Sequence, residues 1–319
     1  MMSHRFVAVL TVGLGLVLGC GGGASGGSAP KQPEQQQPPE PGGEEASPAG
    51  EQAEAGPSES KSAPAGNYPK QEAGRRTEEK RTAEANVGFV LNREDGMAAG
   101  MVDKSWSFSE GRRTSLEKVN KAGIITQFAV LYGKREGKGL ENWTPLPTES
   151  KAYTIKSPGE GLEIVDQDNK KITPEERTVI AREYGWVGKP NPLLVLLARC
   201  KGGEPVNLDK DEITALVGFS PEMDLQSVRA RPAGSQKDKK SGREVTKLDV
   251  DVEGVITSKD TKLAIKMSGP ALVDDKTGYV VDLALAGGID VSGKYVVKER
   301  RLNASGKGKI KLGRSTKIF

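Results

Sequence analysis

Two short groups of side chains in this sequence have the types and spacing for nucleophilic chemistry that does not need histidine. Ser115 is followed three positions later by Lys118, and Lys276-Thr277-Gly278 stands far downstream. A serine hydroxyl becomes a nucleophile when a neighbouring base takes its proton, and a lysine amine can be that base. An acyl-transfer enzyme is therefore one of three functional hypotheses.

These residues match the S-x-x-K and K-T-G motifs in the same order, and so resemble serine penicillin-binding proteins and β-lactamases. The resemblance implies a serine acyl enzyme in which Lys118 helps to activate Ser115. The sequence departs from that family because it has no S-D-N element between the motifs. In addition, Ser115 lies in a predicted strand instead of a helix start, and residues 276–278 lie in a predicted hairpin turn. We keep this enzyme as the remote alternative and predict no catalytic residues.

An uncharged apolar run occupies residues 6–18, directly after His4 and Arg5. Its length is typical of the core of an export signal. The run is too short to span a bilayer, which takes about 20 residues. The sequence therefore predicts a signal peptide over residues 1–19.

The four residues that end this run, Val17-Leu18-Gly19-Cys20, resemble the lipobox of bacterial lipoproteins. The resemblance implies that a peptidase recognises Val17, Leu18 and Gly19, cuts before Cys20, and leaves that cysteine acylated. Acyl chains anchor a protein to a membrane without spanning it. Gly21 follows the cysteine, which by the same resemblance favours the outer membrane. The alternative is an ordinary secretory signal, but the segment lacks an A-x-A-like cleavage site.

Loss of the signal also removes His4, which is the only histidine. Ser-His-Asp and Cys-His arrangements are then excluded, as is nearly every zinc or copper site. Only Cys200 remains as a free thiol, so no intrachain disulfide can form, and we expect it to be a buried, inert thiol. The sequence therefore predicts no metal site, no cofactor and no enzymatic activity.

Residues 20–85 are rich in Gly, Pro, Ser, Ala, Gln and Glu and contain no Val, Ile or Leu. Such a segment buries too little apolar surface to offset its ordering entropy, so we expect a disordered tether. The tether is net acidic, while the whole chain has a net charge of +4. Residues 86–319 are predicted to fold, with 86–228 and 244–319 as two halves.

The second half shows a clear period-two alternation of apolar and polar residues, which is typical of strands with one wet face. In residues 247–253, Leu248, Val250 and Val252 point one way and the acidic residues point the other. We expect those carboxylates to pair with Lys262 and Lys266 across the ladder. Further strands are predicted over residues 262–267 and 279–285 and from residue 295, after a turn at 292–294.

The first half mixes strands and helices. Strands are predicted over residues 115–119, 124–132 and 162–165, and residues 229–243 are expected to be a polar connection. Helices are predicted where capping signals stand: Thr173-Pro174 with Glu176, Asn191-Pro192, and Asp209. We therefore expect an α+β fold: an antiparallel, strongly curved β-sheet with a cluster of short helices inserted midway, preceded by a disordered tether.

Basic residues accumulate near the C-terminus. Residues 294–317 contain nine lysines and arginines and only one acidic residue, Glu299. One interpretation is a contact with an anionic surface such as phosphate-bearing lipid or wall polymer. The other is a charged edge strand that is protected from aggregation. No nucleic-acid-binding motif is present, and we expect no nucleic-acid partner.

The sequence as a whole predicts an outer-membrane lipoprotein whose folded part is a non-enzymatic binding or structural module. Its partners would be the membrane, through acylated Cys20, and an envelope protein or an anionic wall or lipid surface. The alternative is a carrier that holds a lipid or other apolar ligand in a cavity between sheet and helices. That cavity would be lined by Leu193, Leu194, Leu196 and Leu197. A cavity at these leucines would favour the carrier, and a filled core would favour the module.

Overall fold

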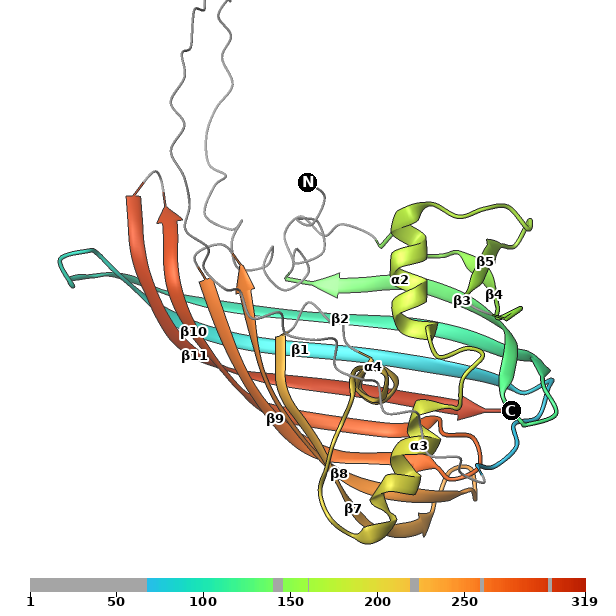
Figure 1. Cartoon of the computed structure of the whole chain (residues 1–319). Helices are drawn as coiled ribbons and strands as arrows, with labels where there is room; N and C mark the ends of the chain where they lie inside the picture. The colour runs from blue at the N-terminus through green and yellow to red at the C-terminus, as the bar shows by residue number, and fades with distance from the viewer. Residues whose placement is uncertain (1–67, 140–145, 160, 219–223, 259–260, 298–299) are drawn as a thin grey trace, which may run out of the picture. The chain divides into compact units, whose positions relative to one another are not determined.

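The computed structural model describes residues 68–139, 146–159, 161–218, 224–258, 261–297 and 300–319. The signal-recognition residues Val17, Leu18 and Gly19 and the lipidation site Cys20 lie outside these ranges. The described strands form one antiparallel sheet (Figure 1). They are β1 (Arg76–Asn92), β2 (Ala98–Val119), β3 (Ile125–Lys138), β4 (Ala152–Lys156), β5 (Glu163–Asp166), β6 (Val206–Asn207), β7 (Asp224–Lys237), β8 (Glu244–Ser258), β9 (Thr261–Asp274), β10 (Val280–Val297) and β11 (Arg300–Ile318).

The sheet has 11 strands in the order β5-β4-β3-β2-β1-β11-β10-β9-β8-β7-β6. Strands consecutive in the chain pair with each other, except that helices carry the chain from β5 at one edge to β6 at the other. The first and last strands, β1 and β11, pair along most of their lengths in the middle of the sheet, from Thr77 opposite Ile318 to Asn92 opposite Asn303. The expected halves, 86–228 and 244–319, therefore share one continuous sheet.

The helices begin at the predicted caps. Among the described residues they are α2 (Pro174–Tyr184), α3 (Pro192–Arg199) and α4 (Lys210–Val217), with a short 3₁₀ turn at Cys200–Gly202. The Thr173 hydroxyl accepts from the Glu176 amide at 3.2 Å, and the Glu176 carboxylate accepts from the Thr173 amide at 2.8 Å. The prediction of these helices is confirmed because a cap is a contact between residues only two or three positions apart. Within the described ranges, no helix combines the length and apolarity needed to cross a bilayer.

The sheet has two different faces. Along β1, Ala83, Ala85 and Val87 are buried, and the residues between them point to the opposite side. We call the side with the buried residues the inner face and the opposite side the outer face. The helices pack on the inner face. Leu193, Leu196 and Leu216 of α3 and α4 join one apolar cluster formed by the strands, and Ile180 and Tyr184 of α2 join a second cluster with Phe128 of β3.

The expected α+β class is wrong. Strands make up 60% of the chain and helices 13%, and the architecture is one large open antiparallel sheet. The three helices exist, but they are short and lie over a sheet that extends much further than the sequence analysis expected (Figure 1). The sheet is larger than expected because some strand segments lack a clear alternation of apolar and polar residues.

The expected boundary of the tether at residue 85 is also corrected, because β1 begins at Arg76. The inward positions Glu79 and Arg81 are charged, so they break the apolar alternation that signals a strand. Likewise, the polar connection expected over residues 229–243 is mostly β7, and the turn expected at 292–294 lies within β10. Backbone pairing with neighbouring strands overrides the weak local preferences of these segments.

Candidate functional site

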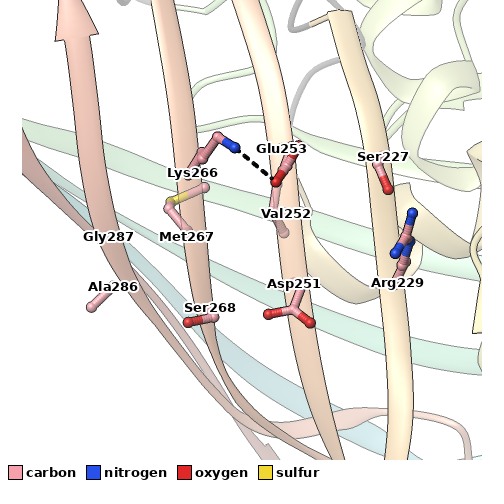
Figure 2. Close-up of a pocket in the computed structure, with 10 residues that line it drawn as sticks. All are labelled: Ser227, Arg229, Asp251, Val252, Glu253, Lys266, Met267, Ser268, Ala286 and Gly287. Atoms are coloured by element: carbon pink, nitrogen blue, oxygen red, sulfur yellow. Dashed lines mark hydrogen bonds and ion pairs between the residues drawn. The ribbon is translucent and has the colours of Figure 1, made fainter. Parts of the chain in front are cut away.

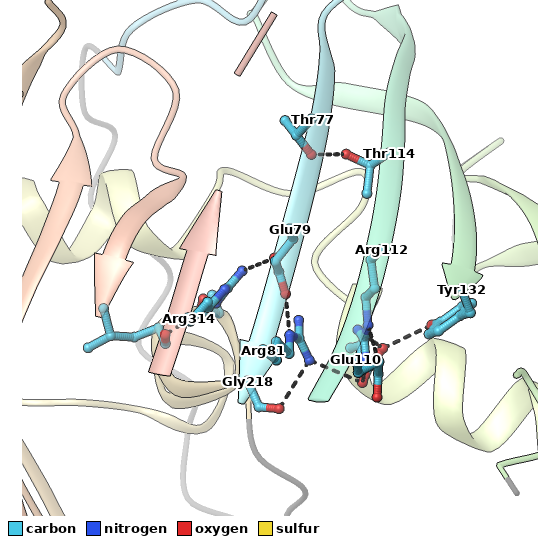
Figure 3. A network of polar contacts seen from close by, with 12 residues as sticks. Thr77, Glu79, Arg81, Glu110, Arg112, Thr114, Tyr132, Gly218 and Arg314 are labelled. Carbon is cyan, nitrogen blue, oxygen red and sulfur yellow. Dashed lines mark hydrogen bonds and ion pairs between the residues drawn. The ribbon is translucent and has the colours of Figure 1, made fainter. Parts of the chain in front are cut away.

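A group of charged side chains is buried on the inner face, beneath α2 and α4 (Figure 3). In the sheet, Arg81 of β1 lies opposite Glu110 of β2 and opposite Arg314 of β11. Glu79 and Arg112 are the next inward residues on β1 and β2, and they also face each other. Strand register therefore brings five charged residues from three strands into one cluster, which we call the inner charge cluster.

The inner charge cluster joins the sheet to α2. Arg112 contacts Glu183 with both terminal nitrogens, and its Nη2 lies 2.8 Å from Glu183 Oε1. The Tyr132 hydroxyl donates to the same carboxylate at 2.9 Å. On its other side Arg112 pairs with Glu110, which also accepts from Arg135 of β3. A planar guanidinium suits this two-sided arrangement because its donors form a fixed fork.

The same cluster closes the C-terminal end of α4. Arg314 donates to the carbonyls of Ala215 and Leu216 and, through Nη2, to Glu79 Oε2 at 2.7 Å. Arg81 donates to the Gly218 carbonyl at 3.1 Å. The last carbonyls of a helix have no partner within the helix, and cations are favourable there. These arginines thus replace water at a buried helix end.

Electrostatics keeps the cluster ionised. Burial alone would raise the pKa of Glu110, but Arg112 and Arg135 outweigh burial and lower that pKa to about 2. Burial also opposes ionisation of Glu79 and Glu183, and the neighbouring arginines again lower both pKa values. Burial and Glu183 raise the pKa of Tyr132 well above its ordinary value. None of these groups is poised to exchange a proton near neutral pH, so the cluster fits a structural role better than acid–base catalysis.

This cluster was not predicted from the sequence. A usable signal was present, because Glu79 and Arg81, like Glu110 and Arg112, stand two residues apart. In a strand that spacing places both side chains on one face. Whether that face is buried depends on Glu183 and Arg314, which are distant in the sequence.

The residues of the enzyme hypothesis lie in different settings. Ser115 and Lys118 lie near the end of β2, an extended strand and not a helix start. Thr277 lies in the turn between β9 and β10, where its hydroxyl donates to Asp274 Oδ1 at 2.8 Å. Among the hydrogen bonds and ion pairs of the described residues, none joins the Ser115 hydroxyl to the Lys118 amine.

The leucines proposed to line an apolar cavity belong to a packed helix. Leu193, Leu194 and Leu196 are at most 4% exposed, and Leu197 packs against the same apolar cluster. Cys200 is buried next to them, and burial raises the pKa of its thiol. The two pockets described below are lined by other residues. These leucines are thus part of a filled core.

A pocket of about 360 Å³ lies among β7, β8, β9 and β10 (Figure 2). Its charged residues are Arg229, Asp251, Glu253 and Lys266. Lys266 Nζ lies 3.1 Å from Glu253 Oε1, which confirms the cross-strand pairing expected for these residues. The four charges balance, so the pocket has no strong preference for an anion or a cation. Among the described residues, no group of three or more His, Cys, Asp or Glu side chains could hold a metal ion.

A second depression, of about 780 Å³, lies where β1, β2, β3 and β11 run side by side. Gly111 and Gly133 leave space there, and the Gly111 carbonyl oxygen would lie only 2.7 Å from a Cβ at position 133. Lys80, Arg113 and Lys317 line the depression from the outer face, together with Glu78 and other polar residues. It is an open depression of the surface and not an enclosed cavity.

Comparison with known proteins gives no family. No family model matches the chain, and no curated protein matches it. One similar solved structure is reported as "Asymmetric conductivity of engineered proteins", with 9% identity over 74% of this chain and 99% of the other, and a TM-score of 0.22. Another is an AttH candidate from Nitrosomonas europaea, with 8% identity over 74% of this chain and 51% of the other, and a TM-score of 0.14. Likenesses this weak carry no argument about function.

Proposed function

We propose that this chain is an envelope lipoprotein, anchored to the outer membrane through acylated Cys20, whose folded part is a non-enzymatic binding module. The lipobox resemblance of residues 17–20 supports the anchor. The loss of the only histidine with the signal supports a role other than histidine-based catalysis.

The observation that carries this proposal is the difference between the two faces of the sheet. The helices pack on the inner face, and the buried charges there are engaged in ion pairs that hold helices and sheet together. The outer face exposes alternate polar and charged residues along β8, β9 and β11. Among the described residues, helices cover only the inner face of the sheet, so the outer face presents a broad polar surface, which is suited to holding a partner.

The anchor is tested with a Cys20→Ala variant expressed in a Gram-negative host that is fed an alkyne-labelled fatty acid. We expect the original chain to carry the label and to fractionate with membranes, and the variant to lose both properties. Cys200→Ala is the matched control, since that thiol is buried, and it should behave like the original chain. A Cys20→Ala chain that stays labelled would refute the anchor.

The binding face is tested with a photo-crosslinking amino acid introduced at single exposed positions in cells. Asp251 reports on the outer face, and Lys201, after α3, reports on the helical side. We expect a discrete crosslinked partner from position 251 and none from position 201. The reverse pattern would contradict an outer-face binding module.

A second candidate is the carrier of an apolar ligand, and one observation favours it. The helices contact the sheet near Arg81 and Arg314, whereas the inner face remains apolar as far as Phe89 and Leu91. Arg81 and Phe89 are eight positions apart on β1, a separation of about 26 Å. In Figure 1 the paired ends of β1, β2, β10 and β11 extend past the three helices. Phe89 and Leu91 are only 2% and 5% exposed there, so acyl chains could lie along this extension only where these side chains become uncovered.

Native mass spectrometry separates the two candidates. The chain from residue 20 onward, with Cys20→Ala and fused behind a cleavable export signal, would be purified from the periplasmic fraction without detergent. An added mass that disappears on denaturation would support the carrier and give the class of ligand. A bare mass would support the module.

A further inference from the structure

β11 carries a row of three lysines on the outer face. Lys307, Lys309 and Lys311 are exposed, and the residues between them point to the inner face. Side chains two positions apart on one face of a strand are about 7 Å apart. The row therefore presents three ammonium groups over about 14 Å. We call it the lysine row.

The position of β11 rules out the simplest explanation for this row. Lysines on edge strands prevent sheets from joining, which was one interpretation of the basic C-terminal stretch. β11 is instead a central strand, paired with β1 on one side and β10 on the other. Its backbone groups are already engaged, so charge is not needed to protect an edge.

The neighbours of the row offer only partial compensation. Lys309 lies between Gly288 of β10 and Asn86 of β1, neither of which is charged. Because both of these neighbours are small residues, the ammonium group of Lys309 is accessible to solvent. Of the ion pairs formed by the described residues, none includes a lysine of the row, although Lys266 on the same face pairs with Glu253.

The two outer lysines each have one acidic residue opposite. Lys307 faces Asp290, and Lys311 faces Glu84. Lys317 lies further along the same face, opposite Glu78, in the second depression. Like charges side by side on one face repel each other, and this cost is recovered when an anionic surface binds.

We propose that the lysine row is a contact surface for the anionic headgroups of phospholipids in a bilayer. Lysine is a compact point charge that binds phosphate without demanding one geometry, which suits a fluid array of headgroups. Each lysine near an anionic membrane surface strengthens binding several-fold. The choice of a membrane as partner rests on the proposed lipid anchor, which keeps the folded part close to a bilayer.

The test uses the chain from residue 20 onward, which contains every described element, with Cys20→Ala so that no acyl chain contributes. Sedimentation measures binding to vesicles in which phosphatidylcholine is mixed with a minor share of anionic phosphatidylglycerol, and pure phosphatidylcholine vesicles are the reference. The test variant combines Lys307→Gln, Lys309→Gln and Lys311→Gln. The control variant combines Lys247→Gln, Lys262→Gln and Lys266→Gln, which removes the same charge from β8 and β9.

We expect binding to the anionic vesicles only, and at least a tenfold loss of it in the lysine-row variant. The control variant should lose less than threefold, and 0.5 M NaCl should abolish binding by screening. None of the substituted lysines is buried, so an unchanged unfolding midpoint in both variants confirms that they are folded. Equal losses of vesicle binding in the two variants would mean that only the net charge of the protein matters, and would overturn the proposal.

A third measurement identifies the source of phosphate. If the lysine-row variant loses binding to soluble polyphosphate but not to vesicles, the row binds a soluble polyanion and the membrane proposal is wrong. Because Cys20 is substituted throughout, none of these results depends on whether the chain is acylated in cells. Failure of the lysine row and failure of the anchor are thus separate outcomes.

Discussion

Arg112 of β2 holds Glu183 of α2 with both terminal nitrogens of its guanidinium, and the Nη2–Oε1 distance is 2.8 Å. Both side chains are buried, at 2% and 11% exposure. The two residues are 71 positions apart in the sequence, so this contact exists only once the sheet and α2 have come together. It is one of the contacts that fix α2 on the inner face.

Replacing Glu183 with glutamine should strongly destabilise the protein. The substitution leaves Arg112 with Glu110 as an ion-pair partner but removes one negative charge from the buried cluster. Breaking a buried ion pair typically costs about 3–5 kcal/mol in the free energy of unfolding. The matched control is Glu78→Gln, which breaks the exposed pair between Arg113 and Glu78 and should cost less than about 1 kcal/mol. Urea denaturation followed by circular dichroism measures both. Similar losses in the two variants would contradict the structural role of the inner charge cluster.

Stability should fall as the pH drops from about 5 to 2. The pKa of Glu110 is lowered from 4.5 to about 2, because Arg112 and Arg135 outweigh the effect of burial. A carboxyl with a lowered pKa in the folded state stabilises the fold above its unfolded-state pKa and loses this contribution as the pH falls toward its folded-state value. The lowered pKa values of Glu79 and Glu183 act in the same direction.

The measurement is the urea midpoint as a function of pH, for the original chain and for Glu110→Gln. The variant should be less stable at neutral pH, and its midpoint should change less between pH 5 and 2. A midpoint of the original chain that is independent of pH over this range would refute the linkage.

Gly287→Ala should destabilise the sheet where β9 and β10 approach closely. A Cβ at position 287 would lie 1.9 Å from the Lys266 carbonyl oxygen, so the strands would have to separate. We expect a loss of about 1–3 kcal/mol in the free energy of unfolding, as in other overpacked sites. Gly288→Ala is the adjacent control, because the nearest atom to its new Cβ is the Gly308 carbonyl oxygen at 3.8 Å. Thermal unfolding of the two variants should give a clearly lower midpoint for position 287 alone.

Thr173→Ala should remove the cap of α2. The Thr173 hydroxyl accepts from the Glu176 amide, and its loss leaves that donor without a partner at the start of the helix. A loss of about 1 kcal/mol is typical of such substitutions. Thr173→Ser keeps the hydroxyl and should remain close to the original stability. If denaturant unfolding gives equal losses for both variants, the cap is not the cause.

The sequence by itself determined the elements whose signals are local. Helix starts at Thr173, Asn191 and Asp209 depend on contacts within one turn, and all three are confirmed. The strand character of residues 247–253 and 262–267 was equally clear, because apolar and polar residues alternate there without interruption. Lipidation of Cys20, which is read from four adjacent residues, stays a prediction.

Only the tertiary structure decided the extent of the sheet and the fate of the charged residues. β1 could not be recognised from its sequence pattern, because its inward positions Glu79 and Arg81 are charged. Such charges are tolerated in the interior only when partners from distant segments are present, here Arg314 and Glu183. The sequence shows that the C-terminal stretch is rich in lysine. That these lysines lie on a central strand depends on the pairing of β11 with β1, the first strand of the chain. Strand pairing and buried ion pairs are long-range interactions, and no local preference specifies them.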